Sequence, residues 1–254
     1  MSEEKLFPEG MEPLGKTPFT FSCHPGVSCF TICCRKVDLV LYPYDVLRLK
    51  RALGINSEEF MRKFSRVVNG DNPYFPTVML SLTEDGKGDC PFLTTEGCSV
   101  YEHRPTDCRT YPLERALDRT PDRRGPNEFY FLTHHDYCKG HDENIETTAR
   151  AYVRSQHLDQ YNTYNELWTE IDTLFRTNPW AGEGAGGAGQ QLAFMICYNI
   201  DGFRSFALER NILASFKLSK QVRRDIALHD EELMKFGFEW LKFLFTGKSS
   251  LIRK

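Results

Sequence analysis

Eight of the nine cysteines lie before residue 140, and this uneven distribution constrains the fold more than any other feature of the chain. A chain of 254 residues can bury a sizeable core without covalent staples, so these thiols are not needed to hold a small fold together. We expect the cysteines to organise the backbone around them, and the rest of the chain to fold in an ordinary way. The sequence therefore predicts a cysteine-bearing domain over residues 19–140 and a helical region over residues 141–254.

The charge balance excludes several classes of protein. The chain has 32 Lys and Arg against 35 Asp and Glu, a net charge of -3. This argues against a strongly basic nucleic-acid binder and against a disordered charged tail. Residues 1–5 are acidic where a signal peptide is basic, and no apolar run approaches the roughly 18 residues of a membrane helix. We expect a cytoplasmic protein that contacts neither nucleic acid nor membrane.

Reducing conditions disfavour structural disulfides, so dense cysteines in such a chain indicate metal or redox chemistry. Four thiols occur within twelve residues in the first run, in which Cys33 and Cys34 are adjacent. Adjacent side chains diverge in a helix or a strand, so these two are expected to serve different metal atoms. Four thiolates suit zinc or an iron-sulfur cluster. Eight thiols predict two such sites or one large cluster, formed by Cys23, Cys29, Cys33, Cys34, Cys90, Cys98, Cys108 and Cys138.

The coarse periodicity predicts a mainly α fold with small irregular β elements. The spacing predicts a helix over Pro43–Leu53, stopped by Gly54, and a second helix that begins at Ser57 and is capped by its hydroxyl. The apolar face of the second helix is expected to run to Val68. Strand candidates follow at residues 76–82, 98–101 and 129–132. After residue 140, helical patterns over 145–177, 190–216 and 221–245 predict a bundle.

Several further residues are candidates for the site. Arg104 and Arg109 flank Cys108 and could screen thiolate charge or donate hydrogen bonds to sulfur, unless they form surface ion pairs with Glu102 or Asp107. The histidines near the cysteines could ligate metal or move a proton, although solvated loop positions are their ordinary role: His24, His103, His134 and His135. Cys197 lies in an apolar helical run, which is typical of a core residue.

The glycines at 182, 184 and 187 match G-x-G-x-x-G, the pattern of dinucleotide sites. Such a site needs a preceding strand, and here the run follows a helix and Asn178-Pro179. A flexible linker at residues 182–189 is therefore the better interpretation.

The cysteine pattern resembles the YkgJ-like CxxCxxCC family of zinc- or iron-chelating domains. The resemblance rests on the run ending in Cys33-Cys34, on Leu41 to Leu49, and on the block from Cys90-Pro91-Phe92-Leu93 to Cys108-Arg109. It covers about the first 140 residues and implies a metal-binding site. The first run departs from the family pattern, since its spacing is C-x5-C-x3-C-C. In its spacing, the first run is similar to the cysteine run of flagellin lysine N-methylases. This resemblance implies an iron-sulfur cluster and leaves methyl transfer open as an activity.

Iron-sulfur is favoured over zinc because the chain lacks the paired C-x2-C knuckles of most zinc sites, and because proline follows Cys90. The first hypothesis is a protein with 4Fe-4S-type cluster(s) that transfers electrons or serves as an accessory factor to a redox or metalloprotein partner. The second is a lysine N-methylase-like enzyme with a structural cluster, and the third is a zinc-stabilised interaction module. Under the first, removal of the metal is expected to unfold the N-terminal half.

Overall fold

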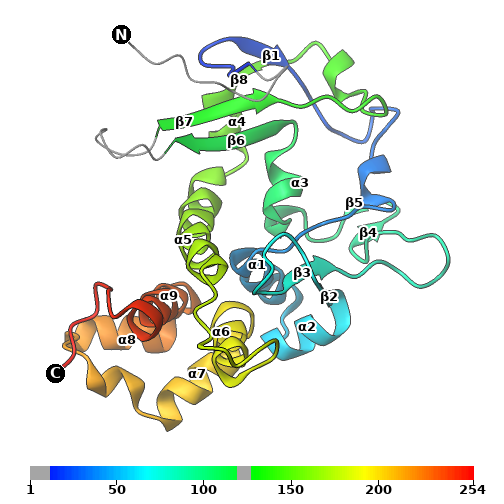
Figure 1. Ribbon diagram of the computed structural model, residues 1–254. Helices are drawn as coiled ribbons and strands as arrows, with labels where there is room; N and C mark the ends of the chain where they lie inside the picture. The colour runs from blue at the N-terminus through cyan, green and yellow to red at the C-terminus, as the bar shows by residue number, and fades with distance from the viewer. Residues whose placement is uncertain (1–11, 119–126) are drawn as a thin grey trace.

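The structure is a computed structural model that describes residues 12–118 and 127–254 (Figure 1). Residues 1–5, on which the prediction of no signal peptide rests, lie outside the described residues, as do residues 119–126 of the predicted cysteine-bearing domain. The described part contains nine α-helices: α1 Pro43–Leu53, α2 Ser57–Phe64, α3 Thr106–Thr110, α4 Ala149–Ser155, α5 Leu158–Arg176, α6 Ala188–Tyr198, α7 Ile200–Glu209, α8 Lys220–Leu228 and α9 Asp230–Thr246. Four short 3-10 turns accompany them: η1 Ile32–Cys34, η2 Tyr101–His103, η3 Gly140–Asp142 and η4 Ile212–Ser215.

The strands form small antiparallel pairs. Within the described ranges the pairs are β1 Pro18–Thr20 with β8 Glu146–Thr148, β2 Ser65–Val68 with β3 Thr77–Leu80, β4 Leu93–Thr94 with β5 Gly97–Cys98, and β6 Leu113–Asp118 with β7 Asn127–Leu132. The β1–β8 pair places Pro18 opposite Thr148, so it connects residues 18–20 to the start of the helical region. The predicted fold class, mainly α with small β elements, is confirmed.

The first predicted helix is confirmed with its predicted ends. α1 runs from Pro43 to Leu53, and Gly54 ends it with φ 65, a left-handed conformation that glycine adopts without strain. Its buried side chains include Val46, Leu47 and Leu49.

The second helix begins where predicted but is capped by another residue. The Asn56 side chain accepts from the Glu59 amide, whereas the Ser57 hydroxyl donates to Asp201. The helix also ends early, at Phe64. Residues Ser65–Val68 leave it as β2 because β3 supplies a pairing partner for their backbone, with Val67 opposite Val78.

The later helices are more numerous and shorter than their patterns predict. The 145–177 segment divides into β8, α4 and α5, with a break at His157, which has φ 52. Residues 188–246 contain α6, α7, α8 and α9, four helices in place of the two helical patterns over 190–216 and 221–245. No helix in the described ranges is long and apolar enough to cross a membrane.

The main core takes side chains from both sides of the predicted boundary at residue 140. Leu41, Leu49 and Phe60 pack in the same cluster as Phe175 and Phe203. Figure 1 shows α1 and α2 next to the helices α5 to α9 at one end, with β6–β7 and β1–β8 at the other. A smaller core lies under these strands and is formed by Phe19, Phe21, Leu113, Ala149, Tyr152, Val153 and Leu158. The division at residue 140 stays a prediction.

A buried ion network reinforces the packing between the two parts. Lys50 Nζ lies 3.0 Å from a carboxylate oxygen of Asp201 and 3.0 Å from one of Asp230. The Ser57 amide and hydroxyl each donate to Asp201 at 2.7 Å. The network therefore connects α1 and α2 to α7 and α9.

Candidate metal centre

The first cysteine run is held by contacts to residues 139 and 140. The Ser22 amide donates to the Gly140 carbonyl at 2.9 Å, and the Lys139 amide donates to Cys29 Sγ at 3.0 Å. The backbones approach so closely that a Cβ on Gly140 would lie 2.8 Å from the Ser22 carbonyl oxygen. Cys138 is thereby brought to the first run from far along the chain.

A second contact joins the end of the first run to the β4–β5 hairpin. The Cys90 amide donates to the Cys34 carbonyl at 2.8 Å, and Arg35 pairs with Asp89 at 2.9 Å. The hairpin places Cys98 opposite Leu93. In Figure 1, β4 and β5 lie beside the blue segment that carries the first cysteines.

Cys108 reaches the same region on the short helix α3. The buried Asp45 carboxylate of α1 accepts from the Thr106 amide at 2.9 Å and from its hydroxyl at 2.7 Å. Burial raises the pKa of Asp45 to about 7, although these hydrogen bonds lower it. Thus α1, which the sequence predicts well, fixes the helix that carries a cysteine.

Electrostatic effects connect the eight predicted cysteines in two overlapping groups. Cys23 is close enough to Cys29, Cys33 and Cys138 for their charges to raise its pKa. Cys34 is affected in the same way by Cys90 and Cys108, and Cys90 by Cys98. Cys33 also acts on the second group, so the two groups are neighbours.

The adjacent pair Cys33 and Cys34 occupies the centre of this arrangement. Their side chains hydrogen-bond to each other, which lowers the pKa of Cys33 to about 7 and raises that of Cys34. Burial and the neighbouring thiols raise the pKa of Cys23 to about 11. Desolvation by the surrounding protein raises the pKa of Cys108, although solvent still reaches its side chain. Proximity of so many thiols disfavours the thiolate form in the absence of a cation.

All nine cysteines are free thiols. Cys197 differs from the other eight because it is 1% exposed in the main core, as its apolar setting predicts. The eight are partly or fully exposed, and their soft sulfur donors fit zinc or iron-sulfur chemistry. Only the chemistry of the donor atoms supports a metal site here. Among the described residues, no group of three or more His, Cys, Asp or Glu side chains is arranged so that it could hold a metal ion.

The two candidate arginines behave differently from each other. Arg104 lies near enough to Cys23, Cys33 and Cys98 to lower their pKa values, so its guanidinium offsets thiolate charge. Arg109 is buried and donates to the carbonyl oxygens of Gln156 and Glu102 instead of to sulfur. It also lies over the Tyr161 ring at 4.8 Å.

The histidines near the cysteines have partners other than sulfur. His24 accepts from the Gly26 amide at 3.1 Å and its Nε2 lies 3.2 Å from Glu143. His103, expected to be exposed, is half-buried because it bonds to Arg48 at 2.9 Å. His135 stacks on the rings of Tyr111 and Tyr137.

His134 stacks on His141, with ring centroids 3.8 Å apart. This contact, like the partners of the other three histidines, supports a structural role near the thiols.

The glycine-rich stretch offers no dinucleotide site of the expected form. It follows α5 and precedes α6, and no strand leads into it among the described residues. Gly182, Gly184 and Gly186 all have positive φ, which fits the predicted linker.

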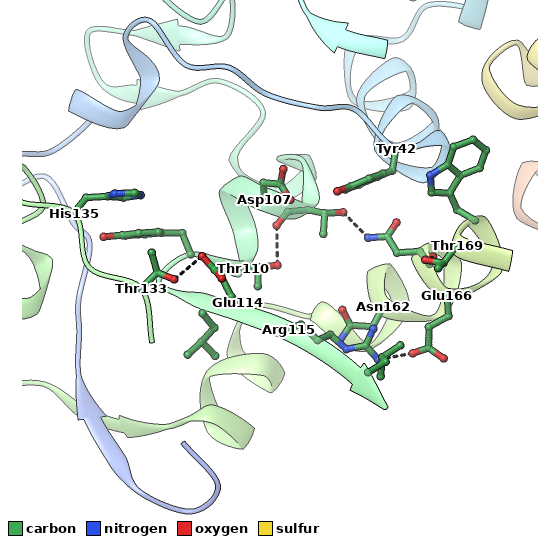
Figure 2. A pocket seen from close by; sticks show the side chains of 16 residues that line it. Tyr42, Asp107, Thr110, Glu114, Arg115, Thr133, His135, Asn162, Glu166 and Thr169 are labelled. Atoms are coloured by element: carbon green, nitrogen blue, oxygen red, sulfur yellow. Dashed lines mark hydrogen bonds and ion pairs between the residues drawn. The ribbon is translucent and has the colours of Figure 1, made fainter. Parts of the chain in front are cut away.

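A cleft of about 860 Å³ adjoins the cysteine groups and was missed from the sequence (Figure 2). Its residues come from α3, the β6–β7 hairpin, α5 and the start of α1: Tyr42, Thr106, Asp107, Thr110, Tyr111, Leu113, Glu114, Arg115, Leu117, Thr133, His135, Asn162, Asn165, Glu166, Trp168 and Thr169. Tyr111 connects the cleft to the thiols, because Cys138 is close enough to its hydroxyl to raise its pKa. The only local signal for this cleft was the position of Asp107 and Tyr111 beside Cys108.

Comparison with known proteins identifies the family that the cysteine-bearing segment resembles. A family model covers residues 22–139, just under half of the chain. It is that of the CxxCxxCC family, described as a "putative zinc- or iron-chelating domain". The resemblance stated from the sequence is confirmed for this CxxCxxCC segment, which contains all eight candidate ligands. No curated protein and no solved structure matches the chain.

Proposed function

We propose that the protein binds iron-sulfur clusters through eight cysteines in two neighbouring sites. One site takes Cys23, Cys29, Cys33 and Cys138, and the other takes Cys34, Cys90, Cys98 and Cys108. The observation that supports this proposal is the convergence of separate loops: the Lys139 amide donates to Cys29 Sγ, and the Cys90 amide donates to the Cys34 carbonyl oxygen. The division follows the partners of Cys23, which are Cys29, Cys33 and Cys138, and those of Cys34 beyond the adjacent Cys33, which are Cys90 and Cys108. The adjacent pair is given one thiol to each site because neighbouring side chains diverge.

Iron-sulfur is proposed over zinc on the spacing and on the donors around sulfur. The chain has no C-x2-C pair, and proline follows Cys90. The Lys139 amide donates to Cys29 Sγ, and amide donors to sulfur tune the reduction potential of such clusters. Bound clusters would supply one-electron chemistry at this position.

The chain's own residues would support such a centre in two ways. Arg104 offsets the negative charge of the thiolates, and Asp45 positions the helix that carries Cys108. Cys23, Cys33 and Cys108 are exposed, so the centre lies near the surface. That position suits electron transfer to a redox or metalloprotein partner, or an accessory role toward one.

Anaerobic purification with iron, zinc and acid-labile sulfide analysis tests this proposal. We expect iron and sulfide in equal amounts and a broad visible absorption that bleaches on reduction. A colourless protein with about two zinc ions per chain would support the zinc-stabilised interaction module instead. Saturable S-adenosylmethionine binding would support the methylase alternative.

A further inference from the structure

The cleft beside the cysteine groups has acceptor groups that lack a donor. Figure 2 shows Asp107, Glu114 and Glu166 around it with one cationic side chain, Arg115. Arg115 already bonds to Glu166 and to Glu128. The cleft as described therefore has no uncommitted Arg or Lys for an anionic ligand.

Asp107 is the carboxylate available to a ligand. Its side chain is exposed, and within the described residues no hydrogen bond or ion pair reaches it. Tyr42 points toward it across the cleft (Figure 2). Glu114 is also exposed, and its carboxylate accepts a single hydrogen bond, from Thr133 at 2.8 Å, among the described residues.

A second acceptor belongs to α5. The Asn165 amide nitrogen donates to the Thr106 hydroxyl at 3.1 Å, while its Oδ1 is buried and has no partner in the described part of the chain. A buried acceptor without a donor costs free energy until a donor reaches it. Asn165 lines the cleft, but solvent does not reach this oxygen, so a ligand N–H group would reach it only after the side chain turns.

The aromatic side chains favour the same kind of ligand. Tyr42, Tyr111 and Trp168 line the cleft. Aromatic rings attract cations through their faces and cover hydrocarbon chains. The two exposed carboxylates and the rings together select an organic cation with N–H donors.

We propose that this cleft binds a small organic amine in its ammonium form, neutralised by Asp107 and Glu114. The inference deepens the proposed function and rests on it in one respect: Asp107, which lines the cleft, precedes Cys108, so the amine would lie beside the metal centre as its substrate or effector.

Calorimetric titration at low ionic strength tests the inference with three four-carbon probes: 1,4-diaminobutane, 1,4-butanediol and succinate. We expect saturable binding of the diamine at least about tenfold tighter than of the neutral diol, and no binding of succinate, because hydrogen bonds to charged groups contribute most of the difference. Equal binding of the three probes, or preference for succinate, would overturn it.

Variants locate the binding. Asp107→Asn and Glu114→Gln should each weaken diamine binding about tenfold, whereas Glu209→Gln, an exposed carboxylate on α7, should leave it unchanged. Glu114 lies on β6 and not on α3, the helix that carries Cys108, so its variant stays informative if Asp107→Asn alters the metal centre. Full-strength binding by both cleft variants would contradict the inference.

Metal and sulfide are measured on the same samples. Diamine binding by protein that proves metal-free would refute the proposed function and leave the cleft assignment intact. Metal-loaded protein that does not bind the diamine would refute the cleft assignment and leave the proposed function intact.

Discussion

At the scale of single residues, the sequence identifies the candidate ligands but not their surroundings. The eight cysteines were found from spacing alone, because thiols clustered so densely in a long chain are typical of metal ligands. The partners of Arg109 and His103 could not be found in this way, since Gln156 and Arg48 reach them only through the fold. Arg104 places positive charge near the thiols, whereas Arg109 packs over the Tyr161 ring.

A cysteine substitution tests the division into two sites. Cys90→Ser should lose about half of the bound metal, because it removes a ligand from one site and leaves Cys23, Cys29, Cys33 and Cys138 in place. Metal content per chain measures this. Cys197→Ala, which alters a core thiol, should retain all of it. Complete loss of metal from Cys90→Ser would favour one large cluster over two sites.

Asp45 predicts a specific pH dependence of stability. Its pKa is raised to about 7, so the folded protein binds a proton that the unfolded chain has lost, and stability falls as pH rises from about 4 to about 7. Asp45→Asn imitates the protonated form. The unfolding free energy of the wild type, relative to this variant, should therefore decrease by up to about 4 kcal/mol over that range.

Urea unfolding of both proteins at pH 5 and pH 8 measures this difference. An unchanged difference between the two pH values would show that Asp45 does not titrate between them.

At the scale of elements, local signals predicted well and pairings between distant segments did not. α1 was correct at both ends because its apolar stripe and Gly54 are local. β2 was mistaken for helix because its partner, β3, lies beyond a loop, and hydrogen bonding to that partner overrides the helical period. The cleft is hidden for the same reason, since α3, β6 and α5 form it together.

Lys50 is expected to matter most for the docking of α1 on α7 and α9. Lys50→Met removes the cation that Asp201 and Asp230 share, and Asp230 keeps Arg51 and Arg204 as partners. We expect it to destabilise the protein by about 1–3 kcal/mol. Lys63→Met, which breaks an exposed pair with Glu59, should cost less than about 1 kcal/mol. Urea unfolding compares them. Equal costs would show that the network contributes no more than a surface pair.

At the scale of the whole molecule, the shared core changes what metal removal should do. Leu41, Leu49 and Phe60 pack with the C-terminal helices. We therefore expect this part of the N-terminal half to stay folded without metal. Residues 21–35 and 133–139 contain no α-helix or strand and carry five of the eight proposed ligands.

Chelation should therefore open these segments and leave most helices folded. We expect anaerobic metal removal to preserve the helical circular dichroism signal and to make residues 21–35 the first site of limited proteolysis. Restoring the metal should reverse the cleavage. Loss of the helical signal together with the metal would show instead that the centre is required for the entire fold.

X-ray absorption of the anaerobically purified protein tests the central claim most directly. We expect iron with a first shell of sulfur alone and a second shell of iron, as thiolate-held clusters require. Iron bound by nitrogen or oxygen, or an iron-free protein with zinc on the thiols, would contradict it.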